Sequence, residues 1–135
     1  MDILAPNGGK VLFKHDKIAD PETHMVTFAT GFVDALIDLR LTFNRPMTVT
    51  GPARTRVRNS HIGGHPRSMH IYDAPSHGLN GLAALDVYVG DVALTAYFVR
   101  LALDTRWSVG VAKTFVHIDL RGLAGLSQAV FGYGS

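Results

Sequence analysis

Cysteine is absent from the 135-residue chain, glutamate occurs only once, and no long uninterrupted apolar run is present. The lack of cysteine excludes disulfides, thiolate zinc sites, iron–sulfur clusters and a cysteine nucleophile. Any transition metal must therefore be held by histidine and carboxylate side chains. The most apolar region, residues 81–103, is interrupted by Asp86, Asp91 and Arg100, so no membrane span is expected.

Charge is also scarce, at 18% of residues against 47% hydrophobic residues, and the formal net charge is +2. A composition of this kind predicts a folded chain, and its length suits one domain. Lysine and arginine are scattered along the sequence, so nucleic acid is not an expected partner. The slight positive charge would suit an anionic cell-wall polymer.

Local patterns predict helices mixed with short strands. A helix is expected to begin at Asp20-Pro21-Glu22, with Glu22 in a capping role, and to run to about Leu41. A second helix is expected over Val92–Asp104, capped by Asp91. Strands are expected over residues 47–50, 83–89, 107–112 and 115–120, the last two forming a hairpin.

These elements predict an α+β fold: a single compact domain with a small, mainly antiparallel sheet flanked by helices. The domain is expected to span residues 1–135. Within it, residues 1–19 would form an N-terminal extension, and residues 122–135 a C-terminal tail packed on the rest.

Histidine is abundant, with seven residues, four of them between positions 61 and 77. A catalytic zinc site needs three protein ligands and one open position, which His70, Asp86 and His117 could supply. Asp86 lies in an apolar strand, where a carboxylate is costly to bury without a partner. Hydrogen bonds from the backbone are the alternative explanation for Asp86, and a solvated strand face is the alternative for His117 and Asp119.

The order of the motifs resembles the zinc D-alanyl-D-alanine carboxypeptidases and murein endopeptidases, which have a hedgehog-type fold and include phage endolysins. That family carries a Ser-x-His motif, a Gly-x-Ala-x-Asp segment and a final His-x-Asp or related motif. The matching segments are Asn59–His70, Gly81–Asp86 and Phe115–Asp119. The resemblance covers about residues 20–121 and implies Zn2+ held by His70, Asp86 and His117.

The resemblance also implies how substrate is bound and cleaved. Residues 48–54 are similar to the strand and turn that deliver a substrate-binding arginine, here Arg54. Arg54 and Ser68 would hold a carboxylate of the cell-wall peptide. Zinc would activate a water molecule, and a carboxylate would take its proton.

Two departures from the family pattern affect the site. Many relatives place an acid three residues before the last histidine, but Thr114 occupies that position. Asp119 is therefore the candidate base, because residues two apart on a strand share a face. The spacing between His70 and Asp86 is also longer than in the family, so an inserted loop is expected to bulge out. It carries Asp73 and His77, which are the alternative base or metal ligand.

We expect a zinc metallopeptidase acting on D-amino-acid stem peptides or cross-links of bacterial peptidoglycan, as a carboxypeptidase or an endopeptidase. No signal peptide is visible at the start of the sequence. A phage virion, or the host cytoplasm before lysis, is the expected location, with other virion proteins as potential partners. The alternative is a non-catalytic structural or cell-wall-binding domain of a phage particle, which Thr114 and the inserted loop favour.

Overall fold

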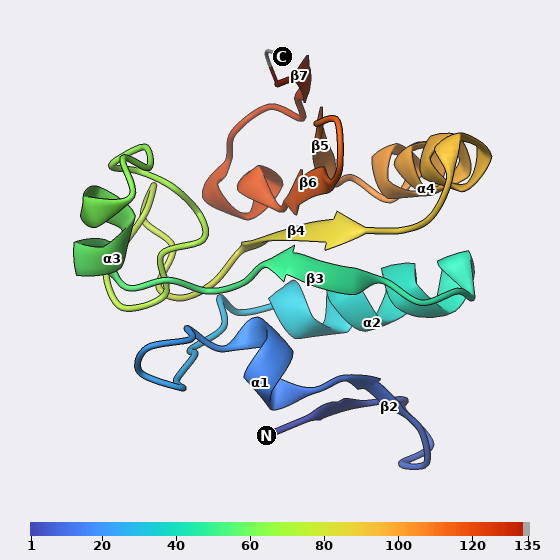
Figure 1. Ribbon diagram of the computed structural model, residues 1–135, viewed down its shortest axis with the longest axis horizontal. Coiled ribbons are helices and arrows are strands. Elements are labelled where there is room, and N and C mark those ends of the chain that lie inside the picture. The colour runs from blue at the N-terminus through green and yellow to red at the C-terminus, as the bar shows by residue number, and fades with distance from the viewer. Residues whose placement is uncertain (134–135) are drawn as a thin grey trace.

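A five-stranded sheet lies at the centre of the computed structural model, which describes residues 1–133 (Figure 1). Its spatial order is β3-β4-β6-β5-β7. The strands are β3 (Thr48–Gly51), β4 (Ala84–Tyr88), β5 (Ser108–Val111), β6 (Val116–Asp119) and β7 (Val130–Gly132). Neighbouring strands are antiparallel except for β5 and β7, which are parallel. The predicted α+β fold with a mainly antiparallel sheet is thus confirmed.

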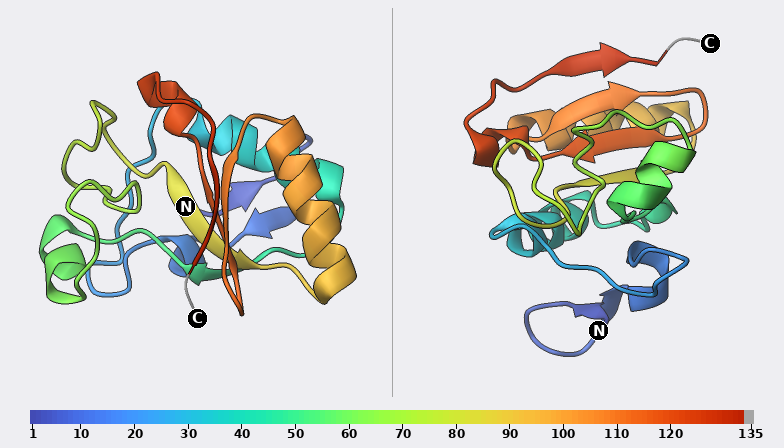
Figure 2. Two further views of the ribbon diagram at one scale, coloured as in Figure 1. Left: turned by 90° about the horizontal axis from the view of Figure 1, so that it is seen from above. Right: turned by 90° about the vertical axis from the view of Figure 1, so that its left-hand side faces the viewer.

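Helices α2 (Phe32–Phe43) and α4 (Val92–Asp104) cover one face of this sheet, as the left view of Figure 2 shows. Helix α4 has the predicted bounds because Asp91 accepts a hydrogen bond from the Leu94 N–H at 2.9 Å. The two helices pack through aromatic side chains. The Phe43 and Phe98 rings lie 5.1 Å apart in an edge-to-face arrangement.

The predicted start of the first helix is wrong. Asp20 does accept hydrogen bonds from the N–H groups of Glu22 and Thr23, at 3.1 and 2.7 Å. These bonds close only a turn, because His24 follows with φ 60°, a left-handed conformation that interrupts a helix. Helix α2 begins twelve residues after Asp20, at Phe32. Glu22 is consequently exposed in the turn and caps no helix.

Several short elements were not predicted. The N-terminal segment folds into strands β1 (Ile3–Leu4) and β2 (Val11–Phe13), which pair with each other, and helix α1 (His15–Ile18). Helix α3 (Arg56–His61) begins where Thr55 accepts the Arg58 N–H at 3.0 Å. In the expected C-terminal tail, a 3-10 helix, η1 (Arg121–Ala124), precedes β7, and residues 134–135 of that tail lie outside the described residues. None of the described helices has the length and apolar character needed to cross a membrane.

The two faces of the sheet differ in what covers them. Helices α2 and α4 bury one face, while α3 and the long loop before β4 lie on the other side (Figure 2). The loop was expected to bulge out, and it is exposed at Asp73, Pro75 and His77, but Tyr72 and Ser76 within it are buried. The Tyr72 hydroxyl also lies 2.9 Å from Thr23 Oγ1. This loop therefore forms part of the domain and carries residues to the second face.

Candidate metal site

The sheet register places two of the predicted ligands side by side. Asp86 on β4 and His117 on β6 are direct partners across an antiparallel pair. Side chains opposite one another in such a pair project from the same face with Cβ atoms about 5 Å apart. Their apolar neighbours Val87 and Ile118 project from the helix-covered face and are fully buried. The alternation of each strand thus separates the core from the site.

His70 reaches the same point from the loop before β4. Its backbone is anchored to the segment that follows β3, because its carbonyl accepts the Arg54 N–H at 2.9 Å. The Arg54 carbonyl in turn accepts the Tyr72 N–H at 3.1 Å. The imidazole is fixed as well, since its Nδ1 lies 3.1 Å from the carbonyl oxygen of Pro52. These contacts hold a buried His70 against Asp86, the middle residue of β4.

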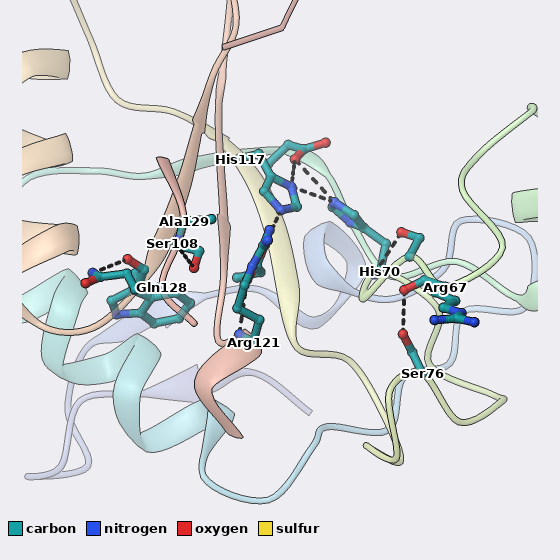
Figure 3. A network of polar contacts seen from close by, with 12 residues as sticks. Arg67, His70, Ser76, Ser108, His117, Arg121, Gln128 and Ala129 are labelled. Carbon is teal, nitrogen blue, oxygen red and sulfur yellow. Dashed lines mark hydrogen bonds and ion pairs between the residues drawn. The ribbon is translucent and has the colours of Figure 1, made fainter. Parts of the chain in front are cut away.

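The three side chains converge, and Figure 3 shows the rings of His70 and His117 side by side. Asp86 Oδ1 lies 2.9 Å from His117 Nδ1 and 3.2 Å from His70 Nε2, and the two nitrogens are 3.4 Å apart. Ligand atoms about 2.0–2.1 Å from a tetrahedral zinc ion are separated by about 3.3 Å. Two imidazole nitrogens and one carboxylate oxygen are also a ligand set that zinc uses in catalytic sites. The residues therefore fit a zinc ion in both chemistry and spacing.

The partners of each imidazole determine which nitrogen faces the cluster. The Pro52 carbonyl can only accept a hydrogen bond, so His70 Nδ1 carries the proton. In the neutral imidazole, Nε2 then has a free lone pair that can bind a metal. His117 Nε2 lies 2.8 Å from Asp119 Oδ2, which assigns the proton to Nε2 and the lone pair to Nδ1. When both imidazoles are neutral, their lone pairs therefore face the space beside Asp86, where a cation would replace the protons of the metal-free site.

Both carboxylates of the site are held in the ionised form. Burial by itself would raise the pKa of Asp86, but in the metal-free site His117 Nδ1 and His70 Nε2 donate hydrogen bonds to it when they are protonated, and these bonds hold its pKa well below its usual range. Burial likewise opposes ionisation of Asp119, yet hydrogen bonds from His117 and Arg121 lower its pKa to about 2. A negative charge at this position is what a bound cation requires.

The cluster opens into a cavity of about 700 Å3. Cationic and aromatic side chains line it. The cations are Arg54, Arg67 and Arg121, and the aromatic rings are those of Phe115, Phe131 and Tyr133. A cavity of this size accommodates a short peptide segment. A metal ion bound by the cluster would therefore be accessible to a substrate.

The substrate-binding candidates lie at this cavity. Arg54 lines it, half-buried, with one guanidinium nitrogen donating to Asn59 Oδ1 at 3.2 Å. Ser68 lines it too, and its Oγ accepts the His70 N–H at 3.2 Å.

The three candidates for the base occupy different environments. Asp119 also lines the cavity, but it is only 2% exposed and pairs with His117 and Arg121, on the side of His117 away from Asp86. Asp73 accepts the Arg56 N–H at 2.8 Å, at the start of α3. His77 is exposed and lines the cavity. Neither Asp73 nor His77 belongs to the convergent group formed by the described residues.

Some residues of the site were not predicted from the sequence. Phe131 and Tyr133 reach the cavity from the tail of residues 122–135, which was expected only to pack on the domain, and Arg121 reaches it from just before that tail. The spacing of Asp119 and Arg121 offered a hint for one of them, since they are two apart like His117 and Asp119. The short segment Val130–Gly132 gave no comparable indication that it joins the sheet.

A small, mainly antiparallel sheet carries an aspartate and a histidine, which a second histidine from the loop before β4 joins at an open cavity; this arrangement defines a candidate metal-binding hydrolase domain. A family model described as Peptidase M15 matches residues 13–119, which include all three members of the cluster. The chain belongs to the Peptidase M15 family. The resemblance to D-alanyl-D-alanine carboxypeptidases and endopeptidases is thereby confirmed at the level of the family. No curated protein and no solved structure matches the chain significantly.

Proposed function

We propose that this chain is a zinc-dependent peptidase that hydrolyses D-amino-acid peptides of bacterial peptidoglycan. One observation carries the proposal: His70 Nε2, Asp86 Oδ1 and His117 Nδ1 converge within 3.4 Å of one another in a chain of a peptidase family. When bound, zinc would lower the pKa of a water molecule and polarise a peptide carbonyl. His70, Asp86 and His117 would hold the ion.

Arg54 is proposed to bind a carboxylate of the substrate. Burial lowers the pKa of its guanidinium, whereas the nearby Asp86 opposes that shift. A partly desolvated guanidinium gains more from an incoming carboxylate than an exposed one does, and its planar fork matches two carboxylate oxygens. Ser68 Oγ accepts from the His70 N–H, so its own proton is available for a second hydrogen bond to the peptide.

His77 is proposed as the group that takes the proton from the attacking water. Asp119 is occupied by His117 and Arg121, and Asp73 by the backbone of Arg56. His77 lines the cavity, and among the described residues no hydrogen bond engages its ring. Histidine is also the side chain that enzymes use most often as a general base. His77→Gln should therefore lower kcat while leaving the metal content unchanged.

A cell-wall-binding domain without catalysis is the second candidate function. Thr114, which stands where many relatives place an acid, is exposed and lies at a different, apolar cavity beside α4. The residue type favours the non-catalytic domain, because threonine cannot supply an acid to the cluster. In either case, we propose the bacterial cell wall as the place of action and a phage virion, or the host cell before lysis, as the setting.

Metal analysis combined with digestion of purified peptidoglycan tests the two functions. For the peptidase, we expect about one equivalent of zinc and newly released peptide ends or D-amino acids. His70→Ala should abolish both, whereas His61→Ala, which changes an exposed histidine of α3, should abolish neither. Bound zinc without new peptide ends would instead support the binding domain. A metal-replete sample that retains no zinc would contradict both functions.

A further inference from the structure

Behind His117, on the side away from Asp86, lies a buried ion pair. Asp119 Oδ2 is 2.8 Å from His117 Nε2 and 2.8 Å from Arg121 Nη2. Asp119 Oδ1 accepts from Arg121 Nε at 3.0 Å and from the Arg121 backbone N–H at 3.1 Å. The carboxylate therefore receives four hydrogen bonds, three of them from Arg121.

Arg121 compensates for the burial of Asp119. A carboxylate that is only 2% exposed is costly to keep ionised unless its charge is paired and its oxygens are hydrogen-bonded. Arg121 does both through a two-pronged contact, which fixes the plane of the carboxylate as well as its charge. Asp119 can then hold the His117 N–H in one direction.

The guanidinium of Arg121 is itself held in place by the C-terminal strand. It lies 5.5 Å from the centre of the Phe131 ring, a cation–π distance. The same ring lies 5.8 Å from the ring of His117. Gly110, which faces His117 across β5 and β6, leaves the space for this packing, since a Cβ there would overlap Phe131. Phe131 of strand β7 thus packs on both Arg121 and His117.

We propose that Asp119 and Arg121 are a positioning pair that orients His117 and directs its Nδ1 to the metal, so that they set the affinity for zinc. Outer partners of a ligating histidine commonly change metal affinity by about 10- to 100-fold. The proposal rests on the proposed function, because it needs the cluster to bind a metal. It adds a residue, Arg121, that lies beyond the family-matched range of 13–119.

A merely structural ion pair makes a different prediction from a positioning pair. If Arg121 only stabilises the fold, its removal lowers the free energy of unfolding of the metal-free protein and leaves zinc affinity alone. If it positions His117, zinc affinity falls whether or not the metal-free protein loses stability. The two quantities can be measured separately on the same variants.

The experiment measures the Kd for Zn2+ by competition with a chelating indicator, for the full chain and for the variants Arg121→Gln and Asp119→Asn. Arg100→Gln, at an exposed position of α4, is the matched control. We expect about 10- to 100-fold weaker binding in both variants, and no change in the control. With Co2+ in place of Zn2+, the visible absorption bands of the two variants should shift in position or intensity.

Thermal unfolding in the presence of a chelator shows which variants remain folded. If Asp119→Asn does not fold, the zinc affinity of Arg121→Gln alone tests the proposal. Wild-type affinity and an unchanged Co2+ spectrum in a folded Arg121→Gln variant would overturn the positioning role and leave the proposed function standing. Failure of the wild-type chain to bind zinc would overturn the proposed function, and the positioning role with it.

Discussion

The two faces of the central sheet use the same strands for different purposes. Toward α2 and α4, β4 and β6 present Leu85, Val87, Val116 and Ile118, each at most 2% exposed. Toward the cavity they present Asp86, His117 and Asp119. The apolar face gains free energy from burial, whereas the polar face depends on each buried group having a partner. One strand can therefore build a core and a site at once, because its side chains alternate.

The comparison is tested most strongly by changing neighbouring residues of β4. Asp86→Asn keeps the size of the side chain but removes the charge, so we expect at least about 100-fold weaker zinc binding and loss of peptidase activity. Val87→Ala, one position along and fully buried, should lower the free energy of unfolding by about 2 kcal/mol and leave zinc affinity unchanged. Zinc titration and chemical denaturation measure the two effects. Equal loss of zinc affinity in both variants would show that the faces are not independent.

Removing a large side chain from the helix-covered face should lower the free energy of unfolding and leave zinc affinity unchanged. Phe98→Ala removes a fully buried ring that packs edge-to-face on Phe43. We expect the free energy of unfolding to fall by about 3–5 kcal/mol. The exposed Tyr97→Ala on the same helix should cost less. Denaturant titration of the metal-free protein gives both values, and a Phe98→Ala loss below that of Tyr97→Ala would contradict the assigned core.

Low pH should remove the contribution of Asp119, on the cavity side of the sheet, to the free energy of unfolding. The folded-state pKa of Asp119 is about 2, below its ordinary value of 3.8. Its contribution is therefore fully present above about pH 4 and is lost as the pH falls toward 2. The shift corresponds to stability on the order of 2 kcal/mol. Unfolding of the chelator-treated protein at several pH values measures it. Asp119→Asn should remove the fall in the free energy of unfolding between about pH 4 and pH 2. Asp104→Asn, at an exposed position, should leave this pH dependence unchanged.

The smallest effect is expected away from both faces, at the cap of α4. Asp91→Ala removes the acceptor of the Leu94 N–H and should lower the free energy of unfolding by about 1 kcal/mol. Zinc affinity should not change, because α4 packs on the opposite face from the cluster. Asp104→Ala, at the other end of the helix, is the control. A change in metal affinity upon Asp91→Ala would show that the helices do reach the site.

Elements with strong local patterns could be predicted, and elements that depend on distant contacts could not. The bounds of α4 and the β5–β6 hairpin follow from a capping aspartate and from apolar runs. Asp20 shows the same capping pattern, yet it closes a turn. Its carboxylate is fully buried and lies 3.7 Å from the Arg58 guanidinium, which comes from another segment. Strand β7 has only three residues and joins the sheet through its pairing with β5.

The residue types and the order of the motifs predicted His70, Asp86 and His117 as the ligands of a metal site without cysteine, with Asp73 and His77 as alternatives. Sequence alone could not show that Asp86 and His117 are opposite each other, because register is set by the pairing of whole strands. It also could not assign Asp119 to the rear of His117 or bring Arg121 and Phe131 against it. Those placements depend on the tertiary structure, in which β7 pairs with β5 and brings Phe131 close to Arg121 and His117. Side chains that are distant in the sequence become neighbours only when the chain folds.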